Sequence, residues 1–395
     1  MDVTDRTVVI SGVGMTRFRR PSERARYELL GQEAVTKALT DAGLAYDAIE
    51  QVYAGWVYGD STSGQRAVYG AGLTGVPIVN VNNNCSSGSS ALYLARQAVA
   101  SGAAECVLAV GFEQMPSGAL DLMFPERTSP LDRHLAVADR YLDGEDGPMT
   151  LKAFAAAARE HMARDGIGPE TYARIAVKAR RHAAGNPNSA YREPIEVADV
   201  LEGKTFLAPL TKLQCCPPTS GAAAAVVCSS DYARRNGLDA SVRILAQAMT
   251  TDFPGSFGDS AIRMVGSEMS QRAAERVYET AGLGPDDIDV CELHDCFTVN
   301  EALSYEALGF TPAGSVAQFV ADGDNTYGGR VVVNPSGGLL SKGHPLGATG
   351  LAQCTELVQQ LRGRAGARQV EGARIGLQHN IGLGGAAVVT LYARA

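Results

Sequence analysis

The sequence has no apolar run that approaches the roughly 20 residues a membrane-spanning helix requires, so no membrane partner is expected. It also lacks an excess of basic residues, because 35 Lys and Arg stand against 43 Asp and Glu, for a net charge of −8. That balance gives no basis for nucleic-acid binding. Neither a membrane protein nor a nucleic-acid-binding protein is therefore expected.

Metal-binding and targeting patterns are absent as well. Eight cysteines are present, but none form a Cys-x-x-Cys pair, and Cys215 and Cys216 are adjacent, so no metal is expected. Residues 1–6 are polar and lack the features of a signal peptide, and residues 392–395 are not a Ser-Lys-Leu peroxisomal address. Reduced thiols in a cytoplasmic protein are therefore expected.

What is present indicates a globular α/β protein. The chain is 395 residues long, 45% hydrophobic and 20% charged, with 44 glycines. Its length predicts two to three domains, and its composition is typical of a folded protein rather than a disordered or fibrous one. Segments of helical period alternate with short β-rich runs, which favours a layered α/β architecture.

Two internal echoes predict a duplicated fold. Residues 42–50 resemble residues 281–289: residue 42 matches 281 and residue 47 matches 286, so the shift is a constant 239 residues. Each copy predicts a helix that ends at a glycine, then a turn and a strand. In the same order, residues 85–88 and 344–347 each open a helix that a hydrophobic strand follows. Two echoes in one order favour duplication over chance.

A segment of different character, with several Pro and Gly residues and amphipathic helices, separates the two halves. The boundaries we expect are an N-terminal half over 1–117 and 220–240, an inserted loop domain over 118–219, and a C-terminal half over 241–395. In the insertion, Arg174, Lys178 and Arg181 fall on one helical face. Such a face suits either a polyphosphate or plain solvation, and the sequence leaves both open.

Cys85 lies in a Ser/Gly-rich turn between a strand-like segment at 76–81 and a helical run at 91–99. Because helix N-termini leave N–H groups unpaired and carry partial positive charge, a thiolate there is stabilised and its pKa is lowered. A thiol tuned in this way is a competent nucleophile. The alternative is a small buried residue with no chemical role.

Three further loops carry groups suited to the same chemistry. His344 precedes Pro345, which suits the first position of a helix, so its imidazole is rigidly placed to accept a thiol proton. His294 and Cys296 follow a strand at 290–293, where α/β active sites gather. The glycine-rich residues 382–385 leave backbone N–H groups able to face a ligand. A structural turn remains the alternative for each loop.

Taken together, the four loops resemble the thiolases, and most closely those of the sterol carrier protein X type. The resemblance covers nearly the whole chain and rests on residues 82–86 (Asn-Asn-Asn-Cys-Ser), 294–297 (His-Asp-Cys-Phe), 323–329, 334–339 and 343–345 (Gly-His-Pro). It implies a duplicated five-layer α-β-α-β-α thiolase fold with an inserted loop domain that binds coenzyme A. A homodimer or homotetramer is also implied.

The resemblance implies a role for each candidate residue. Cys85 accepts the acyl group, and His344 deprotonates it. The backbone N–H groups of Cys85 and Gly382 form one oxyanion hole, and His294, where many thiolases have Asn, forms the other with His344. Asn380 and Gly384 belong to the family's Cys-x-Gly-x-Gly motif, but its thiol is replaced by Asn380. The subfamily resemblance suggests that Cys296 supplies the missing acid/base.

The implied reaction is thiolytic cleavage of 3-ketoacyl-CoA to acetyl-CoA or propionyl-CoA and a shortened acyl-CoA, in fatty-acid or sterol side-chain degradation. Coenzyme A is then a co-substrate, with no permanently bound cofactor, and Arg174, Lys178 and Arg181 are the candidates to bind it. The chain stops just after its last expected strand, so no sterol-carrier domain is expected. A thiolase-like aldol lyase and a non-catalytic acyl-CoA or lipid-binding protein are the alternatives.

Overall fold

The computed structural model describes residues 6–118 and 124–395. Residues 1–5, on which the expectation of no signal peptide largely depends, lie outside the described part. Ten strands form one large sheet, in the order β10-β9-β11-β12-β8-β1-β7-β4-β2-β3. Its centre is the antiparallel pairing of β1 with β8, which is only two residue pairs long and joins two five-stranded halves.

The two halves have the same topology. The first contains β1 (Val8–Met15), β2 (Gln51–Gly55), β3 (Ile78–Val81), β4 (Cys106–Glu113) and β7 (Gly221–Ser229). The second contains β8 (Val242–Thr250), β9 (Val290–Glu292), β10 (Val332–Val333), β11 (Ile375–Gly382) and β12 (Ala386–Arg394). From the centre outward, the orders β1-β7-β4-β2-β3 and β8-β12-β11-β9-β10 match strand by strand. So do the senses of pairing, two antiparallel and then two parallel in each half.

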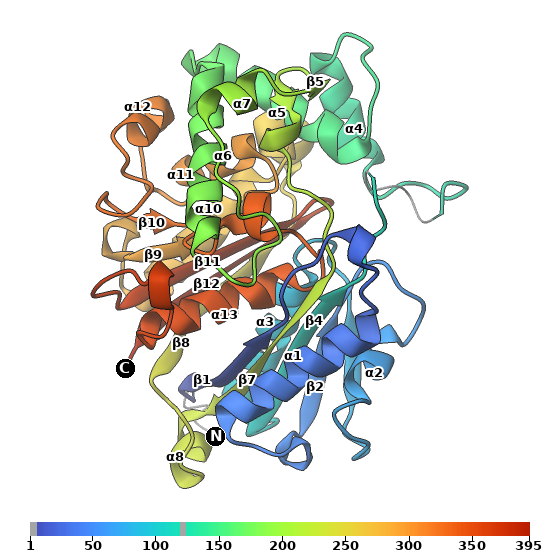
Figure 1. Cartoon of the computed structure of the whole chain (residues 1–395), viewed down its shortest axis with the longest axis vertical. Coiled ribbons are helices and arrows are strands. Elements are labelled where there is room, and N and C mark those ends of the chain that lie inside the picture. Colours follow the sequence, from blue (N-terminus) through green and yellow to red (C-terminus); the bar gives the residue numbers. More distant parts are fainter. Residues whose placement is uncertain (1–5, 119–123) are drawn as a thin grey trace.

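Helices complete the layers. The four that define them are α1 (Tyr27–Ala42), α3 (Ser87–Ala100), α10 (Ser267–Ala281) and α13 (Thr349–Leu361), and the short α2 (Ser63–Val68) packs against α1. Helices α1 and α10 cover the outer faces of the two half-sheets, and α3 and α13 pack against each other between them. Figure 1 has α1 and α13 toward the viewer, and the view from behind brings α3 and α10 forward. This arrangement confirms the expected thiolase fold.

The first internal echo corresponds to two equivalent helix ends. Helix α1 ends at Gly43 with a φ of 70°, and α10 ends at Gly282 with a φ of 66°. Both values lie in the left-handed region that glycine adopts without strain, as the sequence predicted. The second echo corresponds to α3 and α13, but there the helix start differs from the prediction. Helix α13 begins at Thr349, so Pro345 lies in the turn before it and not at its first position.

The segment between β4 and β7 is inserted into the first half of the fold but packs against the second half. It contains α4 (Asp132–Ala138), α5 (Met149–Asp165), α6 (Pro169–Ala184), α7 (Val197–Leu201) and a small hairpin of β5 (Thr205–Leu207) and β6 (Leu210–Thr211). Helix α5 contacts α9 (Ala261–Met264), and α6 contacts α11 (Thr298–Ala307). Their apolar side chains share one core with the second half, and Figure 1 shows these helices above it. The expected domain boundaries stay a prediction.

Other short helices include α8 (Ser230–Arg235), which links the halves, and α12 (Val316–Ala321), which lies near α6, and Gly338–Lys342 forms one π-helical turn. Within residues 6–118 and 124–395, no helix combines the length and the apolar character needed to cross a bilayer.

Candidate active site

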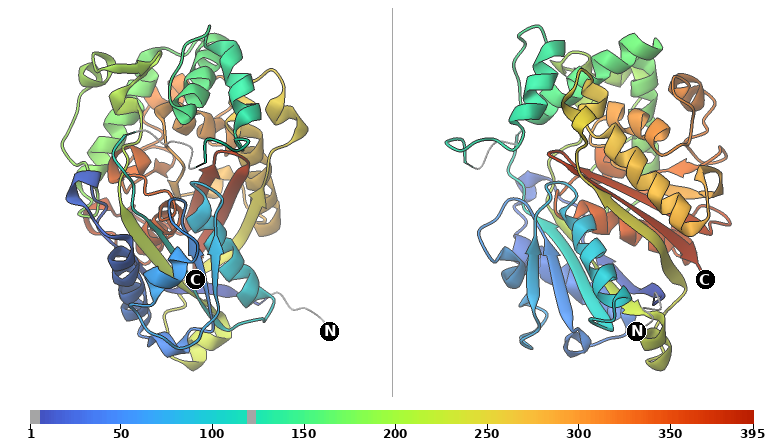
Figure 2. Two further views of the ribbon diagram at one scale, coloured as in Figure 1. Left: turned by 90° about the vertical axis from the view of Figure 1, so that its right-hand side faces the viewer. Right: turned by 180° about the vertical axis from the view of Figure 1, so that it is seen from behind.

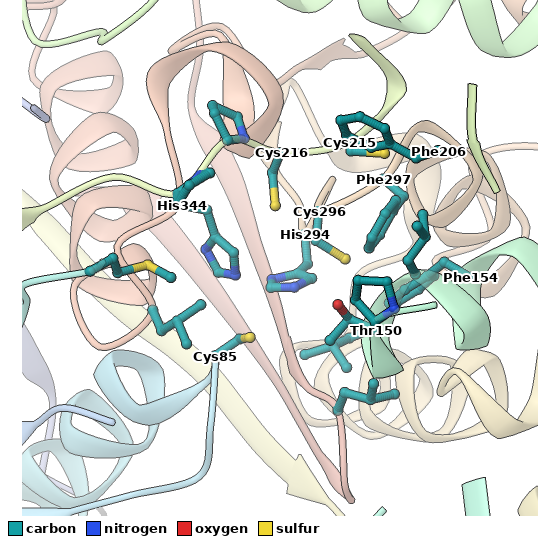
Figure 3. A pocket seen from close by; sticks show the side chains of 18 of the residues that line it. Cys85, Thr150, Phe154, Phe206, Cys215, Cys216, His294, Cys296, Phe297 and His344 are labelled. Carbon is teal, nitrogen blue, oxygen red and sulfur yellow. The ribbon is translucent and has the colours of Figure 1, made fainter. Parts of the chain in front are cut away.

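A cavity of about 450 Å³ lies where the four predicted loops meet the insertion. Cys85, His294, Cys296 and His344 all line it, and Figure 3 shows their side chains converging. Most of its wall is apolar: Met115, Pro148, Leu151, Phe154, Phe206, Pro217, Pro218, Phe297, Leu346, Ile381 and Leu383. The prediction that these loops form one site therefore agrees with their placement, although the chemical role of each residue stays a prediction.

Cys85 lies two residues before α3 and is buried, with 7% of its surface exposed. Asn84 before it has a φ of 51°, a left-handed conformation that makes the sharp turn into the helix. The pKa of the Cys85 thiol is raised to about 12, mainly by burial; a backbone hydrogen bond opposes this shift, and the carboxyl of Glu113 adds to it. The expectation that the helix N-terminus lowers this pKa is wrong, because loss of solvation outweighs the helix dipole.

His344 is held as one tautomer. Its Nδ1 lies 2.7 Å from the hydroxyl oxygen of Thr349, and that hydroxyl donates its single hydrogen to the carbonyl of Pro345 at 3.0 Å. The oxygen of Thr349 can therefore only accept from Nδ1, so Nδ1 carries the ring proton and Nε2 presents a lone pair. Burial and, to a smaller extent, the charge of the nearby Lys342 lower the pKa of His344 to about 3. The imidazole is neutral, and among the described residues its Nε2 has no hydrogen-bond partner, as a general base requires.

His294 is bound on its other side by Asn380, whose Nδ2 lies 2.8 Å from Nδ1 of the imidazole. An amide nitrogen only donates, so Nδ1 accepts and the ring proton lies on Nε2. Burial, and then the neighbouring His344, hold the pKa of His294 well below its usual range. His294 thus lines the cavity as a neutral ring whose proton is on Nε2, the reverse of His344.

The three side chains are close enough to act on one substrate atom. The sulfur of Cys85 and one ring nitrogen of each histidine all lie within 4.8 Å of one another. The two imidazole rings are 5.1 Å apart between centroids and nearly perpendicular, at 82°. Figure 3 shows both rings directed into the space above the sulfur.

Gly382 is packed against the turn that carries Cys85. A Cβ at position 382 would lie 2.1 Å from the carbonyl oxygen of Asn83 and 2.7 Å from the hydroxyl of Ser86. The side chain of Asn84 also donates to the carbonyl of Leu383 at 2.9 Å. Because the two loops are in direct contact, the backbone of Gly382 lies beside the nucleophile turn. Gly384, at a φ of 103°, lies in the turn between β11 and β12.

Cys296 is accompanied by a second thiol that the sequence did not indicate. The backbone N–H of Cys216 donates to the carbonyl of Cys296 at 2.8 Å, and both side chains line the cavity. Burial raises the pKa of each thiol well above its usual range, so both stay protonated. The adjacent cysteines at 215 and 216 match no metal-binding pattern, and no local sequence signal places Cys216 beside Cys296.

The cationic face expected on α6 does not exist as predicted. Lys178 is buried and forms an ion pair with Glu301, and its ammonium also donates to the carbonyl of Val333 at 3.3 Å. It cannot reach a polyphosphate in solvent, so its assignment to coenzyme A is wrong. Arg174 pairs with Glu170, and Arg181 donates to Thr326. Neither arginine lines the cavity.

Two groups of described residues bring three metal-ligating side chains together, which the sequence spacing did not suggest. One is Cys85, His294 and His344, and the other is His161, Asp165 and Glu306. In the first, the proton on His294 Nε2 occupies the lone-pair position that a metal would need. In the second, Arg164 already pairs with both carboxylates. The expectation of no metal stays a prediction.

Comparisons with known proteins give the same family at both ends of the chain. The family model described as "Thiolase, N-terminal domain" matches residues 8–231, and "Thiolase C-terminal domain-like" matches residues 260–393. Sterol carrier protein 2 of Gallus gallus is 53% identical over 395 residues, covering 99% of this chain and 72% of that protein.

Two further relatives differ in the activity that their names state. An acetyl-CoA acetyltransferase of Methanothermobacter thermautotrophicus is 35% identical over 98% of this chain and 100% of its own. Among solved structures, the Ltp2-ChsH2(DUF35) aldolase matches with a TM-score of 0.82 at 25% identity, covering 100% of this chain and 99% of the other.

Proposed function

The chain belongs to the thiolase family, and we propose that it cleaves 3-ketoacyl-CoA esters by thiolysis through an acyl group on Cys85. A thiolase-type reaction on acyl-CoA follows from the family itself. The finer assignment depends above all on one observation: a neutral His344 with a bare Nε2 lies beside the Cys85 thiol. Coenzyme A is the second substrate, and the degradation of fatty acids or sterol side chains is the setting we infer.

In the first step, His344 Nε2 removes the Cys85 proton as the sulfur attacks the keto carbon, C3. Attack requires this transfer because burial holds the Cys85 thiol in its protonated form. The negative charge that develops on the C3 oxygen is stabilised by the backbone N–H groups of Cys85 and Gly382. Gly382 suits that role because its backbone lies against the nucleophile turn.

Collapse of this adduct breaks the C2–C3 bond and leaves the acyl group on Cys85. The electron pair of the broken bond forms an enolate of acetyl-CoA or propionyl-CoA, whose oxygen accepts from His294 Nε2–H and from His344, which now carries the Cys85 proton. Cys296 then donates its proton to C2 of the enolate. A buried thiol with a raised pKa is suited to hold a proton until a strong carbon base forms beside it.

The second half of the reaction returns every catalytic group to its starting protonation state. The thiol of free coenzyme A gives its proton to the Cys296 thiolate and attacks the acyl carbon on Cys85. The tetrahedral adduct expels the Cys85 thiolate, and His344 reprotonates it. The products are the shortened acyl-CoA and the unchanged protein. Because each step is reversible, the same residues would also serve synthesis.

The lining of the cavity supports an apolar acyl chain as the part that remains on Cys85. Phe154 and Phe297 stack with their ring centroids 4.7 Å apart, and Leu151 and Leu383 extend the same wall. Burying apolar surface contributes about 25 cal/mol per Å². A chain longer than acetyl would therefore bind more tightly.

The aldolase among the structural relatives supports a rival proposal, cleavage without a covalent intermediate. A retro-aldol reaction needs a base and an enolate site but no acyl acceptor. The close approach of Cys85 to His344 favours the thiolase reaction, because such a pair generates a nucleophile. A protein that only binds acyl-CoA or lipid would need neither group.

Mass spectrometry of the intact protein distinguishes these proposals. After incubation with a medium-chain acyl-CoA, we expect the wild-type protein to gain one acyl mass on Cys85, and Cys85→Ala to gain none. Cys296→Ala should still be acylated, but its thiolysis of 3-ketoacyl-CoA should fall by about 100-fold or more, because the enolate has lost its acid.

Cys228→Ala is the matched control, because Cys228 is buried on β7 away from the cavity. It should behave like the wild-type protein in both assays. Full thiolysis by Cys85→Ala would refute the mechanism, and normal turnover by Cys296→Ala would remove its assignment as the acid.

A further inference from the structure

Behind His294, a continuous line of buried hydrogen bonds runs away from the cavity toward the far end of β12. Tyr392 donates to Oε1 of Gln378 at 2.6 Å, and Nε2 of Gln378 lies 2.8 Å from the hydroxyl of Ser89. Ser89 lies 2.7 Å from Oδ1 of Asn380, whose Nδ2 is the group that meets His294. All four side chains are buried.

One backbone carbonyl sets the direction of the whole line. Nε2 of Gln378 also lies 2.8 Å from the carbonyl oxygen of Gly350, which can only accept. The nitrogen of Gln378 must therefore face Gly350, and its oxygen must face the Tyr392 hydroxyl. A reversed amide would place two oxygens against each other there.

The remaining orientations follow in sequence. The Ser89 hydroxyl accepts from Gln378 and donates its single hydrogen to Oδ1 of Asn380, so the atom of Asn380 that faces Ser89 is its oxygen. The Asn380 nitrogen is then left facing Nδ1 of His294. Every bond donates in one direction, from Tyr392 to His294, and the Gln378 amide at the start of the line is oriented by a carbonyl in the first turn of α13.

We propose that Tyr392, Gln378, Ser89 and Asn380 are positioning residues that keep His294 in its Nε2–H tautomer, so that it serves as an oxyanion donor and His344 alone serves as the base. The catalytic consequence rests on the proposed function, whereas the tautomer itself does not. It also gives a physical reason for Asn380 where the family resemblance led us to expect a thiol: its amide holds the histidine that shares the site.

Ser89 is the link that the N-terminal half contributes, since it lies on α3 and the other three residues lie on β11 and β12. Gly350 makes room for it, because a Cβ at position 350 would lie 2.1 Å from the Ser89 hydroxyl and 2.8 Å from Oδ1 of Asn380. The line therefore forms only when the two halves of the fold are packed together.

Nitrogen NMR on protein labelled with ¹⁵N-histidine tests the tautomer directly, because the chain has only six histidines. His294→Gln identifies the His294 signals by their disappearance. In the wild-type protein, we expect the hydrogen of His294 to be bonded to Nε2. A wild-type His294 that carries its hydrogen on Nδ1 would overturn the proposal without any variant.

Two variants then test the residues. Ser89→Ala frees the Asn380 amide to rotate, and Asn380→Leu removes the donor, so each should give a mixture of His294 tautomers. Each should also lower kcat of thiolysis by about tenfold or more with little change in KM, because substrate binding is not altered. Unchanged tautomer and unchanged kcat in both variants would refute their assignment.

Ser270→Ala is the matched control. Ser270 is also a buried serine bonded to a buried imidazole, at 2.8 Å from Nε2 of His379. It should change the signals of His379 and leave both His294 and kcat as they are. Acylation of Cys85 is measured on the same samples. A protein with the expected tautomer but no acyl-Cys85 would contradict the proposed function and leave the tautomer standing, and the reverse result would contradict only the tautomer.

Discussion

His294 and His344 hold opposite tautomers in this site because their hydrogen-bond partners differ. The Thr349 hydroxyl accepts from Nδ1 of His344, and the Asn380 amide donates to Nδ1 of His294. At Nε2, His344 therefore presents a lone pair and His294 presents a hydrogen, although both rings are buried and neutral. The sequence alone predicts that both histidines belong to the site, but it does not predict their tautomers. The partner of His344 is 5 positions away and that of His294 is 86 positions away, so the folded structure is needed to identify them.

The lowered pKa of His344 leads to a prediction about acid. An ordinary histidine with a pKa of about 6.5 loses most of its neutral form by pH 5, which would slow a reaction that needs the free base by about 30-fold. His344 has a pKa of about 3, so it stays neutral over that range as pH falls. The rate of Cys85 acylation by acyl-CoA should therefore change less than about twofold between pH 7 and pH 5.

Quenched-flow mass spectrometry measures that rate, with circular dichroism at each pH as the control for folding. A decline in rate with an apparent pKa near 6.5 in folded protein would contradict the buried, neutral state of His344.

At the scale of elements, the close contact between the end of β11 and the nucleophile turn determines the geometry of the site. Gly382→Ala adds a Cβ 2.1 Å from the Asn83 carbonyl oxygen, so one of the two loops must move. Misplacing an oxyanion-hole donor costs about 100-fold in kcat. We expect a loss of that size in steady-state thiolysis, with the protein still folded.

Gly168→Ala is the control for this substitution, because no atom of the residues that the structure describes lies within 4 Å of a Cβ there and its φ of −78° suits alanine. It should retain full activity. If Gly382→Ala retained full activity as well, the backbone of Gly382 would not be part of the oxyanion hole.

Element positions were largely predictable where the signal is local. The repeated helix end at Gly43 and Gly282 predicted the duplication, which the matching strand orders of the two halves now explain. Position relative to other elements was not predictable. Helical periodicity grouped Lys178 with two arginines, but its environment depends on Glu301, on a helix 123 residues away. The contacts of Ser89 with Asn380 and of Cys216 with Cys296 are likewise visible only in the packed fold.

At the scale of the molecule, β3 is the outermost strand of its half of the sheet and leaves one edge unpaired within the described chain. Val79 on β3 is 48% exposed, and the exposed Leu73 and Tyr69 line a second cavity of about 340 Å³ beside it. Exposed apolar edge strands pair readily with other strands. We therefore expect the homodimer or homotetramer that the family resemblance implies to cover this edge with a second copy of the chain.

Val79→Lys tests this prediction, because a charge at the centre of β3 would have to be buried in the interface. In sedimentation equilibrium we expect the wild-type protein at two or four times the single-chain mass of 41.4 kDa, and Val79→Lys at half the wild-type mass or less. Leu201→Lys, at a similarly exposed position on the insertion, should keep the wild-type mass. A Val79→Lys variant at the full wild-type mass would place the interface elsewhere. Because β3 leads directly into residues 82–85, loss of the partner chain should make the turn that carries Cys85 less rigid. The dissociated variant should therefore also have a lower kcat, although Cys85 itself is unchanged.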